Sequence, residues 1–523
     1  MFVKISMLGV FFAVTIAVGL ICRNRGASVD GFVLGGREIG PWLTAFAYGT
    51  SYFSAVVFVG YAGQFGWRFG ISAVWIGLGN AFIGSLLAWV VLARRTRIMT
   101  RHIDSATMPD FFGKRYASPS LKLGASVITF VFLVPYTASL YNGLSRLFSM
   151  AFSVDFTVCI AAMAILTGVY VITGGYRATA VNDLIQGAIM LAGIIAVISS
   201  VLAVNGGFSA SLDALSRVED AAVSASPGIF ASFFGPAPLD LLGVVMLTSV
   251  GTWGLPQMVQ KFYSIRSEKN INTGTVVSTV FAVIVSGGCY FLGAFGRLFT
   301  DGASVAAGGF DSIIPAMLSG FSDPLIGAVI VLVFAASIST LSSLVMASAS
   351  TFTLDFLRGV SAKKMSEKTQ ILVIKILIAA FIAVSSVIAT IQYKGGVSLI
   401  AQLMGVSWGA LAGAFLAPFL YGLYWRGATP RAVWCNFIFA SAFMIANIFF
   451  RPYFPKILAS PINAGAFTMF AGLVIVPLVS AFTAKPAKAL VNNCFACYET
   501  TVSVKAAESL GSQASAKRLK LQD

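Results

Sequence analysis

Long apolar runs recur along most of the chain and are separated by short polar stretches. Each run is about 20 residues long, which is the length that crosses the hydrocarbon core of a bilayer as a helix. The recurrence predicts an all-α integral membrane protein with thirteen transmembrane helices. They are roughly 3–22, 41–63, 71–93, 121–150, 154–174, 180–204, 237–262, 272–299, 323–352, 371–392, 397–424, 430–450 and 461–483.

The composition excludes a soluble globular protein. Of the 523 residues, 58% are hydrophobic and only 10% are charged, whereas soluble proteins carry about 25% charged residues. The single His and the six scattered Cys argue against a metal centre or a disulfide framework, and the lone CxxC of Cys494 and Cys497 is a weak zinc signal. No metalloprotease motif, carboxylate pair or nucleophile motif lies at membrane depth, so an enzyme is not expected.

The net charge of +16 would suggest a nucleic-acid partner if the protein were soluble. The positive-inside rule explains it better, because most basic residues fall on one face of the predicted topology. That face is predicted to be cytoplasmic, with the N-terminus outside, the C-terminus inside and no nucleic-acid partner. The outer face receives only Lys4, Arg68, Arg146, Arg217, Arg297, Lys394, Arg451 and Lys456.

The polar segments outside the helices are short. Residues 1–483 are interpreted as one transmembrane domain with a longer outer loop at 206–236. Residues 484–523 form a basic tail rich in Ser and Ala, which we expect to be cytoplasmic and largely disordered. At about 40 residues this tail is too short for a catalytic or signalling domain.

Two of the predicted helices look interrupted. The second reads PWLTAFAYGTSYFSAVVFVG and the seventh reads VVMLTSVGTWGLPQMVQKFY, with Gly, Ser, Thr or Pro at mid-depth. Gly and Pro are common in membrane helices, so one break alone would carry little weight. The two helices lie five apart, however, and an odd offset gives them opposite orientations. Matching breaks of this kind indicate an inverted-repeat transporter with a site at the midplane.

The ninth predicted helix carries an unusual number of hydroxyl side chains in the stretch VFAASISTLSSLVMASAS. A single Ser or Thr in a membrane helix more often bonds its own i−4 carbonyl or joins two helices. A cluster that faces carbonyls freed by a broken helix can instead bind a hard cation. Ser339 and Thr340, one turn beyond Ala336, together with the backbone near Thr50 and Phe53, form such a candidate cluster.

A carboxylate and a guanidinium, Asp183 and Arg177, are predicted at the cytoplasmic mouth of the sixth helix. A carboxylate there can be an ordinary residue of a helix start, stabilised by the helix dipole. It can equally be a waypoint for a departing cation, because ionisable groups near membrane depth tend to be functional.

Five segments carry a resemblance to a known family: FVLGGREIGPW (32–42), TMPDFFGKRY (107–116), GGYRATAVNDLIQGAIM (174–190), GLPQMVQKFYS (254–264) and FAASISTLSS (334–343). Through them the chain resembles the bacterial sodium:solute symporter family over residues 1 to about 483. The resemblance implies the LeuT-type fold, with two inverted five-helix repeats at about 41–204 and 237–424. It also implies one extra helix before the repeats, two after them, and a place in the bacterial inner (cell) membrane.

The resemblance also implies site residues. Sodium ligands would be the backbone carbonyls of Thr50, Phe53 and Ala336 and the hydroxyls of Ser339 and Thr340, with Asp183 helping sodium leave to the cytoplasm. A solute cavity would be lined by Tyr52, Tyr136, Asn142, Trp253, Gln257 and Gln402.

The expected function is therefore a sodium-coupled secondary symporter that imports a small organic solute across the lipid bilayer. The family's bacterial proline branch has an aspartate where this chain has Tyr52, and several segments look closer to the pantothenate branch. An organic anion such as pantothenate is thus ranked ahead of proline, with sugars and monocarboxylates as further alternatives. No Lys or Arg is expected at mid-membrane. A membrane sensor is the non-transport alternative, but the tail leaves no room for a signalling module.

Overall fold

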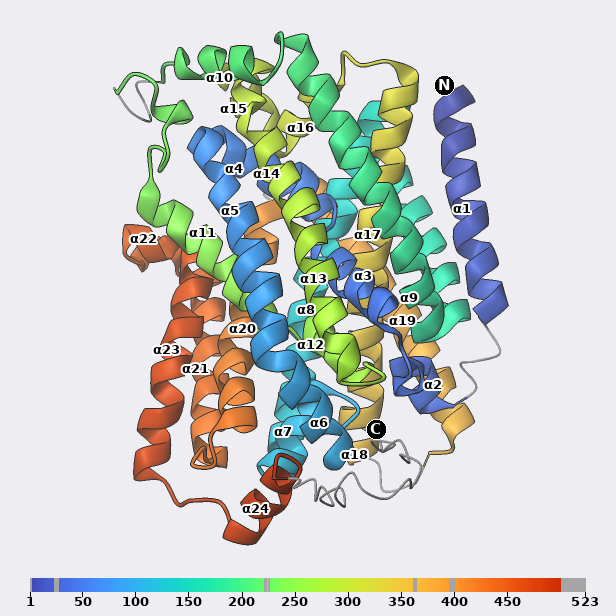
Figure 1. Cartoon of the computed structure of the whole chain (residues 1–523), viewed down its shortest axis with the longest axis vertical. Helices are drawn as coiled ribbons and strands as arrows, with labels where there is room; N and C mark the ends of the chain where they lie inside the picture. Colours follow the sequence, from blue (N-terminus) through green and yellow to red (C-terminus); the bar gives the residue numbers. More distant parts are fainter. Residues whose placement is uncertain are drawn as a thin grey trace, which may run out of the picture.

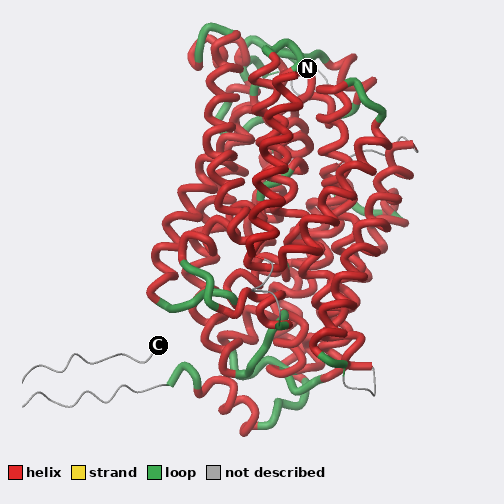
Figure 2. The backbone as a smooth tube through the Cα atoms, turned by 90° about the vertical axis from the view of Figure 1, so that its right-hand side faces the viewer, coloured by secondary structure: helices red, strands yellow, loops and turns green. Residues whose placement is uncertain are grey.

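The computed structural model describes residues 2–22, 28–220, 223, 226–360, 365–394 and 400–499. Within these ranges the protein is helical throughout, and its strand-like pairing is limited to an isolated parallel bridge between Ile39 and Ile265. Long helices run side by side along the long axis (Figure 1), and most loops lie at the two ends (Figure 2). The all-α class predicted from the apolar pattern is confirmed.

The helices are the following. The first part of the chain forms α1 (Phe2–Cys22), α2 (Val29–Leu34), α3 (Pro41–Tyr52), α4 (Ala62–Phe69), α5 (Val74–Gly79), α6 (Arg94–His102), α7 (Met108–Arg115), α8 (Pro119–Phe152), α9 (Phe156–Val204) and α10 (Phe208–Ser216). The middle part forms α11 (Pro238–Val250), α12 (Pro256–Tyr263), α13 (Lys269–Ala282), α14 (Gly288–Ala294), α15 (Gly302–Gly308), α16 (Ile313–Leu318), α17 (Asp323–Thr351) and α18 (Arg358–Val360). The last part forms α19 (Glu367–Lys394), α20 (Ile400–Tyr424), α21 (Pro430–Phe449), α22 (Lys456–Ala459), α23 (Pro461–Phe482) and α24 (Lys488–Ala496).

Ten helical stretches of the described residues are long and apolar enough to cross a membrane, and an eleventh is added if the bent pair α11–α12 counts as one span. The thirteen-helix prediction differs from this count in two places. The second predicted helix is divided between α3 and a stretch that begins at Val56 and continues into the third. The fifth predicted helix corresponds to the first part of α9, which includes the apolar segment Phe156–Val169. Between the second and third predicted helices the backbone turns at Gly70, where φ is 61°.

α9 consists of two helices joined at Gly175. The backbone there has φ 62° and ψ −174°, a conformation outside the helical region that favours glycine. A Cβ atom at this position would lie 3.0 Å from the ring of Phe32. The fifth and sixth predicted helices are therefore connected by a sharp turn, and the second helix begins about two turns before Asp183.

The two interrupted helices are joined to each other at one end. The backbone N–H of Ile39 donates to the carbonyl of Ser264 at 3.1 Å, and the N–H of Arg266 donates to the carbonyl of Ile39 at 3.2 Å. Ile39 lies just before α3, and Ser264 follows α12. This bridge fixes the start of the first broken helix against the end of the second.

The two ends of the bundle carry different caps (Figure 1). α10, α15 and α16 lie at the end where the N-terminus lies, and α2, α6, α7 and α24 lie at the opposite end. The expectation of a disordered tail is wrong for α24, which packs on the helix ends: Arg115 lies 4.9 Å from the ring centroid of Phe495, and His102 bonds the carbonyl of Asn493 at 2.8 Å. Residues 500–523 of the predicted tail lie outside the described residues.

Candidate functional site: two broken helices and the side chains that face them

The first break follows α3. Its last residue is Tyr52, and Phe53 adopts an extended backbone with φ −106° and ψ 130° before helical structure resumes near Ala55. The N–H of Phe53 still reaches the carbonyl of Thr50 at 3.2 Å, and the N–H of Ala55 is taken by the hydroxyl of Ser337 at 2.9 Å. α17 thus satisfies a donor that the break releases, while the freed carbonyls also turn toward α17.

Five oxygen atoms converge where α17 faces this break. The Oγ of Ser339 lies 3.1 Å from the carbonyl of Thr50 and 2.9 Å from that of Ala336. The Oγ1 of Thr340 lies 2.8 Å from the carbonyl of Phe53, 3.0 Å from that of Ala336 and 3.3 Å from that of Thr50. The structure brings together all five residues that the sequence placed in the cation site, and each is at least 98% buried.

The oxygen cluster has more acceptors than donors. Each hydroxyl carries one proton, so Ser339 and Thr340 can make two donated bonds, whereas three carbonyls and five short oxygen–oxygen contacts are present. The carbonyl of Thr50 also accepts the N–H of Phe53, but a carbonyl oxygen has two lone pairs, so these oxygens can still bind a positive group. A hard cation that accepts neutral oxygen ligands fits this donor set.

The second break separates α11 from α12. Residues Gly251–Gly254 form a 3₁₀ turn, Leu255 is extended at φ −85° and ψ 122°, and the two helices meet at 46°. Pro256 opens α12 where a missing N–H costs nothing. Gly254 sits against α20, because a Cβ atom there would lie 2.8 Å from the Cα of Ala412. The break is therefore pressed against α20 rather than α17.

Aromatic side chains fill the space between the two breaks. The ring of Trp408, on α20, lies 5.9 Å from the ring of Tyr52 and 5.9 Å from that of Tyr136. The hydroxyl of Tyr52 donates to the carbonyl of Thr248 at 2.6 Å, so a residue beside the first break binds one beside the second. Gln402 was named from the sequence on the eleventh predicted helix, but Trp408 on the same helix was not. The available signal for Trp408 was its aromatic side chain on a helix that was already selected.

Polar atoms remain available around these rings. The Oε1 of Gln257, in the first turn of α12, and the Nε1 of Trp408 are buried and have no hydrogen-bond partner among the described residues. The side chain of Tyr136 is directed toward Ser54 and Trp408. Three of the predicted cavity residues, Tyr52, Tyr136 and Gln257, thus lie at or beside the breaks.

The other three predicted cavity residues point elsewhere. The indole of Trp253 donates to the carbonyl of Ile83 at 3.0 Å, and the amide of Asn142 donates to Gln392 of α19 at 3.3 Å. Gln402 accepts a bond from Arg451 at 3.2 Å and lines an outer cavity of about 210 Å³. These residues were selected from the helices on which they lie, and the helix alone does not give the direction in which a side chain points.

Asp183 was predicted at the mouth of the sixth helix. Its side chain is fully buried, and neither carboxylate oxygen has a hydrogen-bond partner among the described residues. Lys261, in α12, is 2% exposed and donates from Nζ to the Oγ of Ser343 at 3.0 Å. No Lys or Arg was expected from the sequence at mid-membrane, and the structure places Lys261 of α12 inside the bundle.

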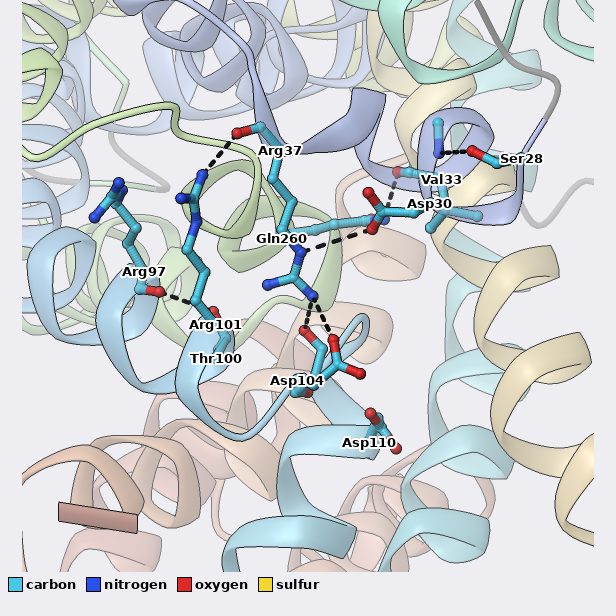
Figure 3. A network of polar contacts seen from close by, with 12 residues as sticks. Ser28, Asp30, Val33, Arg37, Arg97, Thr100, Arg101, Asp104, Asp110 and Gln260 are labelled. Atoms are coloured by element: carbon cyan, nitrogen blue, oxygen red, sulfur yellow. Dashed lines mark hydrogen bonds and ion pairs between the residues drawn. The ribbon is translucent and has the colours of Figure 1, made fainter. Parts of the chain in front are cut away.

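Arginines link the elements at the end of the bundle opposite the N-terminus (Figure 3). Arg37 donates to the carbonyl of Ser105 at 2.8 Å, and Arg101 donates to the carbonyl of Arg37 at 2.7 Å. Gln260 of α12 donates to the carbonyl of Val33 in α2 at 3.2 Å. Backbone carbonyls that end helices are thus bound by side chains from neighbouring elements, which ties α2, α6 and α12 together.

Comparison with known proteins places this geometry in a family. The model of the sodium:solute symporter family matches residues 32–439. The osmoregulated proline transporter OpuE of Bacillus subtilis (strain 168) is 26% identical, with 93% of this chain and 96% of that protein covered. A sodium/proline symporter of Staphylococcus aureus is 27% identical, with 81% of each chain covered.

A solved structure has the same fold. A Na⁺-coupled sialic acid symporter in a substrate-bound, outward-open state superposes with a TM-score of 0.70, covering 93% of this chain and 99% of that chain at 15% identity. The likeness bears on the fold alone, and it confirms the LeuT-type fold that the family resemblance implied.

Proposed function

Because the chain belongs to the sodium:solute symporter family, we propose that it is a sodium-coupled importer of a small zwitterionic solute, with proline as the first candidate. The observation that carries the proposal is the convergence of five oxygens from Thr50, Phe53, Ala336, Ser339 and Thr340. Membership in this family makes it a multi-pass membrane transporter rather than an enzyme.

Sodium is the coupling ion in this proposal and binds between the break after α3 and α17. A bound ion satisfies the surplus carbonyl acceptors and fixes the extended backbone at Phe53, which raises solute affinity by linkage. Each sodium ion that enters with a neutral solute adds about 2.3 kcal/mol of driving force per 100 mV of membrane potential. The residues of the two breaks include no Asp, Glu or His, so a proton is not expected to replace sodium there.

The solute is proposed to bind between the two breaks, against Tyr52, Tyr136 and Trp408. Aromatic faces attract an ammonium group, and none of these side chains offers a positive charge to a lone carboxylate. This chemistry suits an amino acid better than an organic anion, and the relatives that carry proline in their names support the same choice. They do not support pantothenate, so the ranking made from sequence is reversed. Tyr52 still counts against proline, because it stands where the proline branch has an aspartate.

The transport cycle follows the inverted-repeat arrangement. Sodium and solute enter from outside, the two broken helices move against α8, α9 and α17, and the ion leaves inward past Asp183. The N-terminus is placed outside and the C-terminus inside by the distribution of basic residues, in a bacterial cell membrane. Sugars and short monocarboxylates remain the alternative solutes, since aromatic walls also stack on a sugar ring.

The proposal is tested with the purified full chain in proteoliposomes. Uptake of labelled L-proline, pantothenate, a sugar and a short monocarboxylate is measured with an inward gradient of sodium and, separately, of choline at equal ionic strength and with a pH gradient. We expect proline to accumulate only with sodium. Equal accumulation in choline would overturn sodium coupling, and accumulation of pantothenate without competition by proline would overturn the choice of solute.

A further inference from the structure

Lys261 is a buried basic side chain that contacts the helix carrying the proposed sodium ligands, and nothing in the transport scheme above uses it. Its ammonium is buried, donates to Ser343 at 3.0 Å and lies 5.1 Å from the ring centroid of Tyr176. A buried ammonium is costly unless neighbouring groups stabilise its charge. Its placement therefore calls for a role beyond packing.

A directed chain of hydroxyls runs from Lys261 to the first break. The hydroxyl of Ser51 donates to the carbonyl of Ala47 at 2.6 Å and lies 2.8 Å from the hydroxyl of Ser343. Since the proton of Ser51 is used by Ala47, Ser343 must donate to Ser51 and accept from Lys261. Ser51 directly follows Thr50, and Ser343 lies three residues beyond Thr340. The ammonium thus lies about one helical turn, roughly 5 Å along the axis, from the oxygen cluster.

Asp183 lies on α9, which packs against the first broken helix. Gly187 of α9 packs against Thr50, because a Cβ atom there would lie 3.2 Å from the Thr50 side chain. Asp183 is one turn further inward on the same helix face. Lys261 lies 5.1 Å from the ring centroid of Tyr176, which is on α9 about two turns before Asp183, so the ammonium and the carboxylate lie in the same buried region. A single carboxylate therefore faces two cations, the lysine ammonium and a sodium ion one turn away.

We infer that the Lys261 ammonium is a tethered competitor of sodium, which keeps the affinity of the proposed sodium site low enough for the ion to be released. The inference rests on the proposed sodium site. Without sodium, the ammonium compensates the charge of Asp183. With sodium bound, two cations about one turn apart repel each other in a medium of low dielectric constant, and both are attracted by the same carboxylate. Lys261 is a positioning residue for the ion, and it does not contact the solute.

The test uses sodium binding alone, so it does not depend on the identity of the solute. The thermal unfolding midpoint of the purified protein is titrated with NaCl while choline chloride keeps the total salt constant. Lys261→Gln removes the competing charge and leaves Asp183, so we expect half-maximal stabilisation at about tenfold lower sodium. Lys261→Arg keeps the charge and should remain within about threefold of the parent protein.

The partner variants make the competition specific. Asp183→Asn should raise the sodium concentration needed, and Lys261→Gln/Asp183→Asn should return it toward the parent value, because both charges are gone. Lys269→Gln removes an exposed inner-face charge and is the matched control. If Lys261→Gln does not fold, the double variant against Asp183→Asn measures the same coupling.

The outcomes separate the inference from the proposed function. If NaCl does not stabilise the parent protein beyond choline chloride, the sodium site itself fails. If the parent responds and Lys261→Gln needs the same or more sodium, the tethered-competitor inference is wrong. A lower requirement that Lys269→Gln also produces would overturn it too, because the effect would then come from net charge.

Discussion

The chain is interrupted twice within the bundle, once after α3 and once between α11 and α12, and the two interruptions face different neighbours. Each releases backbone groups at an extended residue, Phe53 in the first and Leu255 in the second. The first lies against α17, which presents hydroxyls, and the second lies against α20, which presents Trp408.

This difference shows that a helix break does not by itself determine which ligand its freed backbone groups bind. A freed carbonyl can bind a cation, a solute donor or a neighbouring hydroxyl, and the helix that packs opposite decides among them. α17 adds oxygen ligands to the carbonyls of the first break, whereas α20 adds an aromatic wall to the second. The comparison therefore predicts that changes on α17 act on sodium and changes on α20 act on the solute.

The largest effect is expected from removing both hydroxyls opposite the first break. Ser339→Ala/Thr340→Ala deletes two of five oxygens, so we expect the sodium concentration for half-maximal uptake to rise by well over tenfold. Sodium-dependent uptake of the transported solute in proteoliposomes measures it. Ser342→Ala is the control, because its hydroxyl bonds the carbonyl of Ser339, on its own helix, at 2.9 Å. An unchanged sodium requirement in the double variant would mean that the hydroxyls only join helices.

The next largest effect is expected at α20, which packs against the second break. Trp408→Ala removes the wall between Tyr52 and Tyr136, and we expect the KM for the solute to rise about tenfold. The sodium requirement at saturating solute should stay within about twofold. Trp253→Phe is the matched control, since that indole bonds Ile83 away from the rings. A shift of the sodium requirement as large as that of KM would contradict the division between α17 and α20.

A moderate effect is expected inward of both breaks. Asp183→Asn removes the carboxylate on the proposed exit route, so the release of sodium inside should slow and turnover should fall several-fold. Equilibrium binding of the solute at saturating sodium should change less, because Asp183 does not lie among Tyr52, Tyr136 and Trp408. Paired measurements of turnover and equilibrium affinity decide it, and a large loss of affinity with normal turnover would contradict this placement.

The smallest effect concerns pH and lies outside both breaks. Burial raises the pKa of the Asp311 carboxyl to about 6, although Arg146 at 3.8 Å opposes the shift. The folded protein therefore keeps a proton that the unfolded chain loses near pH 4, so stability falls as the pH rises from about 4 through 6. The full shift corresponds to about 3 kcal/mol.

Asp311→Asn should flatten this part of the stability profile. Thermal unfolding of the purified protein between pH 4.5 and 7.5 measures the slope, and Asp301→Asn, an exposed carboxylate of the same outer region, is the control. The sodium requirement should be unaffected at either pH. A slope that persists in Asp311→Asn would place the responsible group elsewhere.

The sequence was most informative where the backbone itself forms the site. Thr50, Phe53 and Ala336 contribute carbonyls, and Ser339 and Thr340 sit on a helix whose face follows from its period, so their convergence could be predicted. The all-helical class and the two breaks followed in the same way, from apolar length and from Gly and Pro at matching depth.

The solute side was less predictable because it depends on rotamers and on long-range packing. Asn142 and Gln402 lie on the selected helices but point toward Gln392 and Arg451. Trp408 was overlooked on the same helix as Gln402. The positive-inside count assigned Lys261 to the inner face because it lies at the end of the seventh predicted helix, whereas the structure buries its side chain in the bundle.

The bridge between Ile39 and Ile265 couples the two broken helices at the ends that it joins, so that these ends move together. Two backbone hydrogen bonds, of 3.1 Å and 3.2 Å, cross between elements more than two hundred residues apart in the chain. Motion of either helix at this end is thereby transmitted to the other without passing through either ligand. A pair of spin labels at positions 38 and 267 should keep one fixed distance through the whole transport cycle. A pair with one label on α2 and the other on α18 should instead show two distances. The distance across the bridge would then be a constant reference against which the opening of the inner mouth is measured.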